Sequence, residues 1–337
     1  MKVDAGLVCA LGDVPREAPR LEGIGFDGLL AAETSHDPLF PLLLAAEHTE
    51  RVELVTSILV AFARSPMTVA AQAHDLQSFS RGRLVLGLGS QIKPHITKRF
   101  SMPWSKPAAR MREYILALRA IWECWYENAG QGLDFRGEFY THRLMTPMFT
   151  PQDVEHGAPR VWLAAVGPLM CETAGEVADG LIAHAFATSR YLREVTLPAV
   201  ERGLERAGRA RDSFEVVYPG FVVSGSDERE MQRRRTAVCK QIAFYGSTPA
   251  YRPVLELHGW GELQDELNAM SKRGLWDEMG RQIDDDVLSE FALVGAPEEI
   301  PDRFAERFGG LVDRTSSAID WAAEEHRGEI LARLRSL

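Results

Sequence analysis

Two apolar runs decide the fold of this chain: VELVTSILV at Val52–Val60 and RLVLGLG at Arg83–Gly89. Between them, Ser65 and Pro66 form a helix-start signature, because serine can cap the first turn and proline fits the first helical position. The helix that they predict extends to about Ser80. Both runs are nearly continuous in apolar residues, which is typical of parallel strands covered on both faces. The stretch therefore predicts a strand–helix–strand unit of a parallel sheet.

The same alternation of strand and helix extends along the chain in both directions. Eight strands are predicted, at Lys2–Val8, Phe26–Ala32, Val52–Val60, Arg83–Gly89, Val161–Ala165, Gly180–His184, Phe214–Ser224 and Leu311–Thr315. A terminal helix is predicted from about Ser317 to Leu334. Eight strands that alternate with helices fit a closed barrel or a doubly wound sheet. Two irregular stretches, at about 128–159 and 245–290, are interpreted as loop insertions, so we expect a single domain over residues 1–337.

The composition limits the classes of function. The chain has 337 residues, of which 45% are hydrophobic, and this is ample for a large core. A formal net charge of -10 argues against nucleic acid or anionic lipid as a partner held by a general field. The four cysteines are scattered, which indicates neither a disulfide scaffold nor a zinc site. No secretory h-region or membrane-length apolar stretch is present, so we expect a cytoplasmic protein without a metal.

Polar residues gather where the predicted strands end, and that is where barrel enzymes place their active sites. The titratable candidates are Glu33 and His36 after the second strand and His184 at the end of the sixth, and we expect catalytic roles for them. For Glu33 the alternative is an ion pair with a neighbouring arginine. Asp37, directly before Pro38, is interpreted as the cap of the next helix rather than as a ligand contact.

Two glycine-containing strand ends are candidate anion sites. The segment GLGS at Gly87–Ser90 lacks the third glycine of a dinucleotide fingerprint, so it fits better a bare strand end that a ligand approaches. In the segment AVGP at Ala165–Pro168, glycine precedes a helix whose first residue is proline. The free amides at such a helix start can hold an anion. Tight turns without a ligand are the alternative at both places.

Four longer segments carry a family resemblance: VTSILVAFARSPM at Val55–Met67, DLQSFSRGRLVLGLGSQ at Asp75–Gln91, PRVWLAAVGPLMCETAGEVADGLI at Pro159–Ile182 and GAPEEIPDRF at Gly295–Phe304. Together they resemble the luciferase-like monooxygenase superfamily. Three further segments, His36–Leu54, His95–Ser105 and Gln241–Gly261, resemble its branch that depends on the deazaflavin coenzyme F420.

The resemblance implies a (β/α)8 TIM barrel, which decides between the two sheet architectures, and a homodimer. It also implies a cofactor at the C-terminal mouth of the barrel and a cis peptide bond, by position Ser57–Ile58, beneath the cofactor ring. We therefore expect cofactor contacts from Ser57, Ile58, Gly89, Ser90, Val166 and Gly167.

The expected function is hydride transfer between coenzyme F420 and a small organic substrate. The alternatives are an FMN-dependent monooxygenase of the luciferase-like type and a non-catalytic flavin-binding protein. An aldolase would need a Schiff-base lysine at a strand end, and only Lys93 lies near one. One departure concerns the order His36-Asp37, since many F420 enzymes have Asp-His after the second strand. Asp37 then serves as the helix cap, and His36 keeps the ring-contact or proton-donor role.

Overall fold

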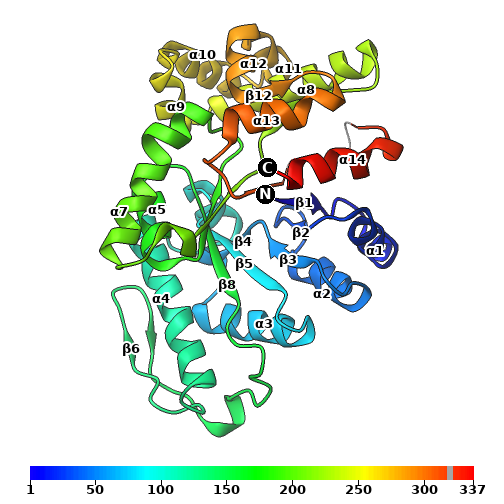
Figure 1. The fold of residues 1–337 in the computed structure, drawn as a ribbon. Coiled ribbons are helices and arrows are strands. Elements are labelled where there is room, and N and C mark those ends of the chain that lie inside the picture. Colours follow the sequence, from blue (N-terminus) through cyan, green and yellow to red (C-terminus); the bar gives the residue numbers. More distant parts are fainter. Residues whose placement is uncertain (317–321) are drawn as a thin grey trace. The chain divides into compact units, whose positions relative to one another are not determined.

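The computed structural model describes residues 1–316 and 322–337 (Figure 1). By its internal contacts the chain divides into two compact units. Unit 1 comprises Met1–Ala5, Ala183–Pro198 and Val216–Leu337, and unit 2 comprises Gly6–Ile182 and Ala199–Glu215. Each unit is described by itself below. The expected single domain stays a prediction.

The central sheet has a strand at each of the eight predicted positions, although the seventh contributes only its first part. Its main strands are β1 (Lys2–Gly6), β2 (Gly28–Ala31), β3 (Glu53–Thr56), β5 (Leu84–Gly89), β8 (Arg160–Ala165), β9 (Gly180–Ala183), β10 (Glu215–Tyr218) and β13 (Arg314–Thr315). Their order is β3-β2-β1-β13-β10-β9-β8-β5, and β3 also pairs with β5, so the eight strands form a closed ring. The predicted (β/α)8 barrel is therefore confirmed, and the doubly wound alternative is wrong.

Unit 2 contributes the strands from β2 to β9 and the helices that cover them. These helices are α1 (Val14–Ile24), α2 (Leu39–His48), α3 (Pro66–Phe79), α4 (Pro107–Tyr126), α5 (Pro168–Val177) and α7 (Leu197–Arg206). Consecutive helices from α1 to α5 pack side by side (Figure 1). The predicted cap of α3 is present, because the Ser65 hydroxyl accepts a hydrogen bond from the Thr68 amide at 3.2 Å. The cap predicted for α2 is displaced by one residue: Pro38 is the N-cap and the helix begins at Leu39, although the Asp37 carboxylate still accepts from the Leu39 amide at 2.9 Å.

The third predicted strand is interrupted. Residues Glu53–Thr56 form β3, and Leu59–Val60 form the short strand β4, which pairs with β5 in parallel. The interruption is the Ser57–Ile58 peptide bond, which is cis as the resemblance implied. The apolar run VELVTSILV continues across this bond, so the hydrophobic pattern alone could not reveal the break.

Unit 1 contributes β1, β10 and β13 to the sheet and carries most of the C-terminal helices. Outside the sheet, β11 (Phe221–Val223) pairs with β12 (Ala292–Val294) in parallel, and they form a separate two-stranded sheet. The seventh predicted strand, Phe214–Ser224, is therefore wrong as one element. Its apolar residues divide between β10 and β11, with the turn Pro219-Gly220 between them.

The two predicted insertions differ in structure. In residues 128–159 a short antiparallel hairpin is formed by β6 (Phe135–Arg136) and β7 (Thr141–His142). The region 245–290 is mainly helical, with α9 (Arg252–Leu257), α10 (Gly261–Lys272), α11 (Trp276–Met279) and α12 (Asp285–Phe291) after the long helix α8 (Glu228–Gly246).

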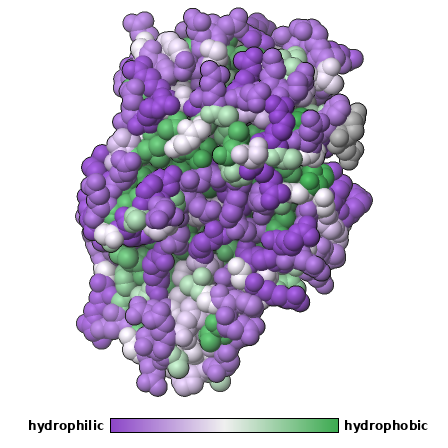
Figure 2. All heavy atoms as spheres, in the orientation of Figure 1, coloured by the Kyte–Doolittle hydropathy of each residue, from purple (hydrophilic) through white to green (hydrophobic). Residues whose placement is uncertain are grey.

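The remaining helices complete unit 1: α6 (Ser189–Tyr191), α13 (Ile300–Phe308) and α14 (Glu324–Arg335). The predicted start of the last helix at Ser317 lies outside the described residues. Hydrophilic side chains cover most of the face drawn in Figure 2. In residues 1–316 and 322–337, no helix is both long and apolar enough to cross a membrane.

Candidate active site

In unit 2, the C-terminal ends of four neighbouring strands bring most of the predicted site residues to one side of the sheet. Strand β2 leads to Glu33, and the β3–β4 junction carries Ser57 and Ile58. The other two ends are Gly89–Ser90 after β5 and Val166–Gly167 after β8. The registers Ala31↔Thr56, Val60↔Gly89 and Leu88↔Leu163 are parallel, so these ends lie along the same edge.

The glycines of β5 allow close packing against the cis bond. A Cβ atom built on Gly87 would lie 2.0 Å from the Thr56 carbonyl oxygen, and one on Gly89 would lie 2.7 Å from Ile58 Cδ1. The Thr56 hydroxyl donates a hydrogen bond to the Gly87 carbonyl at 2.8 Å. Ser57 and Ile58 remain partly exposed, whereas Gly87 and Gly89 are buried. The bare backbone of β5 therefore fixes Ile58 as a partly exposed apolar surface at the strand ends.

Gly167 presents open backbone at the start of α5. It is the N-cap residue, with an extended conformation and no neighbouring atom within 4 Å of a Cβ built on it. The amides of Met170 and Cys171 both donate to the Gly167 carbonyl at 3.1 Å. Among the described residues, the amide of Leu169 has no acceptor. The dipole of α5, the free amide of Leu169 and the open space at Gly167 together favour an anionic group at this helix start.

Glu33 is held in an ion pair, which is the alternative that the sequence left open. Its carboxylate lies 2.8 Å from Arg64 Nη1 and also accepts from the Val60 amide at 2.8 Å. Arg64 Nη2 lies 2.7 Å from the carboxylate of Asp37. Burial disfavours the Arg64 charge, but hydrogen bonds and attraction from Glu33 and then Asp37 raise the pKa of this guanidinium above its ordinary value. The cluster therefore keeps one cation fixed between two carboxylates.

Other sequence candidates lie outside these contacts. His36 is exposed and, in the described part of the chain, makes no hydrogen bond or ion pair. Lys93 is likewise exposed. No three His, Cys, Asp or Glu side chains among the described residues are grouped so as to hold a metal ion.

His184 belongs to unit 1 and lies directly after β9. Its ring stacks on Tyr251 with centroids 4.7 Å apart and meets Tyr245 edge-on at 4.6 Å. Burial lowers the pKa of His184 to about 4, so its imidazole is neutral at pH 7. Sequence reasoning named His184 but missed both tyrosines, because they lie more than 60 residues away in a region predicted to be irregular and partly helical.

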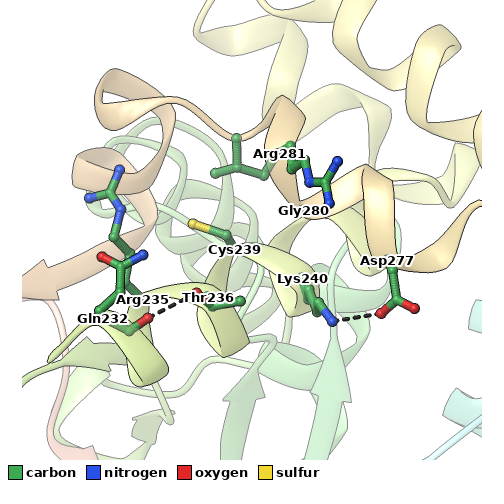
Figure 3. Close-up of a pocket in the computed structure, with 9 residues that line it drawn as sticks. Gln232, Arg235, Thr236, Cys239, Lys240, Asp277, Gly280 and Arg281 are labelled. Carbon is green, nitrogen blue, oxygen red and sulfur yellow. Dashed lines mark hydrogen bonds and ion pairs between the residues drawn. The ribbon is translucent and has the colours of Figure 1, made fainter. Parts of the chain in front are cut away.

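A separate polar cavity of about 620 Å³ lies in unit 1 between α8, α11 and the turn Gly280–Gln282 (Figure 3). Its lining contains none of the predicted site residues and consists of Gln232, Arg235, Thr236, Cys239, Lys240, Asp277, Gly280, Arg281 and Ile283. Lys240 is paired with Asp277 at 2.6 Å, as the dashed line in Figure 3 shows, and Arg235 with Asp285. Acidic partners therefore already neutralise two of the three cations that line this cavity, and Arg281 is the third.

Comparison with known proteins decides the family. The sequence pattern described as "Luciferase-like monooxygenase" matches residues 5–314. The chain belongs to the luciferase-like monooxygenase family. It is 54% identical over 325 residues to an "uncharacterized protein" of Mycobacterium tuberculosis (strain ATCC 25618 / H37Rv). The aligned region covers 96% of this chain and 95% of that protein.

Two further similar proteins have a named activity. This luciferase-like chain is 28% identical over 272 residues to a 5,10-methylenetetrahydromethanopterin reductase of Archaeoglobus fulgidus, with 79% of this chain and 76% of that protein covered. The structure of a coenzyme F420 dependent tetrahydromethanopterin reductase from Methanopyrus kandleri matches with a TM-score of 0.77 and 20% identity. That match covers 99% of the luciferase-like chain and 96% of the reductase, and it supports the TIM-barrel fold.

Proposed function

We propose that the chain is an oxidoreductase that transfers a hydride between coenzyme F420 and a small organic substrate. Its membership of the luciferase-like family supports an F420- or flavin-dependent oxidoreductase. The main structural support for a cofactor site is the open backbone at Gly167, on the strand next to the glycine-containing end of β5.

The residues present fit a flat ring with an anionic tail. Ile58 offers a partly exposed apolar surface, and the missing side chain at Gly89 gives it room. The hydroxyls of Ser57 and Ser90 flank this surface as polar groups on adjacent strand ends. Gly167 leaves open space at the start of α5, where a helix dipole favours a phosphate. Val166 remains partly exposed before it and adds apolar surface.

F420, when bound, supplies the hydride chemistry, while the protein supplies orientation and proton handling. In our proposal Glu33 acts through Arg64, whose guanidinium it holds next to the Ile58 strand end. His36 is the exposed imidazole on the same loop and stays our candidate for proton transfer. We expect His36→Ala to lower turnover at least about tenfold with little change in stability, as is typical for loss of a general acid or base. Full turnover by this variant would leave His36 as a surface residue.

FMN is the second candidate cofactor, because the sequence resemblance also implies an FMN-dependent monooxygenase as the alternative. An FMN phosphate would suit the start of α5 equally well, so Gly167 does not discriminate between the two. A non-catalytic flavin-binding protein would bind one of the cofactors without turning over any substrate. The homodimer expected from the resemblance also stays a proposal, and light scattering of the purified chain tests it.

The Gly167 site is tested by Gly167→Asp. A carboxylate at this position would oppose a phosphate held at the start of α5 by roughly 1–3 kcal/mol, so we expect the cofactor Kd to rise at least about tenfold. The matched control is Gly23→Asp, because a side chain at Gly23 also meets nothing within 4 Å but lies in α1. Fluorescence titration with the preferred cofactor measures both. Equal affinity of folded Gly167→Asp and Gly23→Asp would remove this site from the proposal.

A further inference from the structure

His184 lies between two tyrosine rings in unit 1, over a base of buried phenylalanines. The angle between the ring planes is 28° for Tyr251 and 86° for Tyr245. Phe186 and Phe291, both about 1% exposed, stack below with centroids 4.5 Å apart. His184 and both tyrosines remain partly exposed. The group therefore presents an aromatic surface with polar atoms at the end of β9.

The hydrogen bonds of His184 determine where its ring proton lies. The backbone amide of Phe186 donates to Nδ1 at 3.0 Å. An amide can only donate, so Nδ1 must be the unprotonated nitrogen, and in the neutral ring the proton lies on Nε2. Nε2 lies 3.2 Å from the Tyr251 hydroxyl. Nε2–H therefore donates to the Tyr251 oxygen rather than accepting from it.

This direction leaves the hydrogen of the Tyr251 hydroxyl unused. Among residues 1–316 and 322–337, no acceptor for that hydrogen is present. Since Tyr251 is partly exposed, a phenol that accepts one hydrogen bond and keeps its own hydrogen unused can donate that hydrogen to a bound ligand. Burial, and then repulsion from Tyr245, raise the pKa of Tyr251 to about 12, so the hydroxyl keeps this hydrogen at neutral pH.

The surroundings specify the kind of ligand. The hydrogen-bond and ring partners of His184 and Tyr251 are aromatic side chains and backbone, without a charged group. Moving a carboxylate or phosphate onto such a surface without a cation is costly, whereas a neutral oxygen needs only one donor. A flat apolar body can lie against the exposed ring surfaces.

We propose that Tyr251 donates a hydrogen bond to an uncharged oxygen of the substrate, a carbonyl or hydroxyl on a flat apolar body, and that His184 is its positioning residue. This inference rests on the proposed function, because it assigns the substrate class to the same enzyme. It changes the role of His184, which then orients Tyr251 rather than exchanging a proton with substrate.

Ligand-observed NMR titration of the full chain without cofactor tests the proposal, with acetophenone as the neutral carbonyl and benzoate as its anionic counterpart. We expect acetophenone to bind more tightly than benzoate. Tyr251→Phe should weaken acetophenone binding about 3- to 10-fold, the effect of one hydrogen bond, and should leave benzoate unchanged. Tyr245→Phe is the matched control, since the Tyr245 hydroxyl has Gln241 as its donor and no bond to His184.

The positioning role is tested by two variants of His184. His184→Gln can still accept from the Phe186 amide and donate to Tyr251, so it should keep most of the acetophenone affinity. His184→Leu can do neither and should match Tyr251→Phe. Wild-type protein that binds benzoate as tightly as acetophenone, or that binds neither, overturns the proposal, as does equal loss in Tyr251→Phe and Tyr245→Phe. Titration of the same proteins with F420 and FMN tests the proposed function separately.

Discussion

His184, which is neutral and largely buried, should make the stability of the protein depend on pH in a defined window. Its pKa is about 4 in the folded chain, against an ordinary value of 6.5. Between these values the unfolded chain binds a proton that the folded chain does not. Stability is therefore complete above about pH 6.5 and falls as the pH is lowered toward 4. The shift of about 2.5 pH units corresponds to roughly 3 kcal/mol at 1.36 kcal/mol per unit.

The perturbation is His184→Gln, which keeps both hydrogen-bonding functions but cannot titrate. Urea unfolding of wild type and variant at intervals from pH 7.5 to 4.5 gives the two free energies of unfolding. In their difference, the pH dependence that comes from carboxylates common to both proteins cancels. We expect wild type to lose about 2–3 kcal/mol more than the variant over this interval. Parallel pH profiles, or an NMR titration of His184 near pH 6.5, would refute the buried neutral imidazole.

Two further predictions concern the strand ends of unit 2. Gly87→Ala should destabilise the fold by about 2 kcal/mol or more, because its Cβ would lie 2.0 Å from the Thr56 carbonyl oxygen. The control Gly12→Ala should change stability little, because the space around Gly12 is open. Equal unfolding midpoints of the two variants would contradict this packing. Arg64→Leu should cost about 3 kcal/mol by leaving the nearly buried Glu33 carboxylate without its cation. Glu33→Gln in the Arg64→Leu background should recover part of this loss, and additive losses in chemical denaturation would argue against the pair.

The strands could be predicted from the sequence because buried parallel strands are short apolar runs with clear ends. Observed boundaries such as Leu84–Gly89 and Arg160–Ala165 differ from the predicted ones by one residue. The breaks within the third and seventh strands could not be found in the same way. At Ser57–Ile58 and at Pro219-Gly220 the apolar pattern resumes directly after the break, so periodicity indicates one continuous strand.

The sequence predicted which residues lie at the candidate site, but it did not predict which side chains they contact. Strand ends identified Glu33, Gly167 and His184, because barrel enzymes place functional residues after their strands. The pairing of Glu33 with Arg64 across 31 positions, and of His184 with Tyr251 across 67, depends on tertiary structure. Those partners nevertheless matter for the chemistry, since they occupy hydrogen-bonding atoms of Glu33 and His184.

The most direct test of the central claim is fluorescence titration of the purified, cofactor-free chain with coenzyme F420 and with FMN under the same conditions. The proposed function predicts saturable binding of F420 with a Kd at least about tenfold lower than that of FMN, a difference of roughly 1.4 kcal/mol. Preferential binding of FMN would contradict the cofactor assignment, and binding of neither would contradict the proposal that the strand ends around Ile58 and Gly167 form a cofactor site.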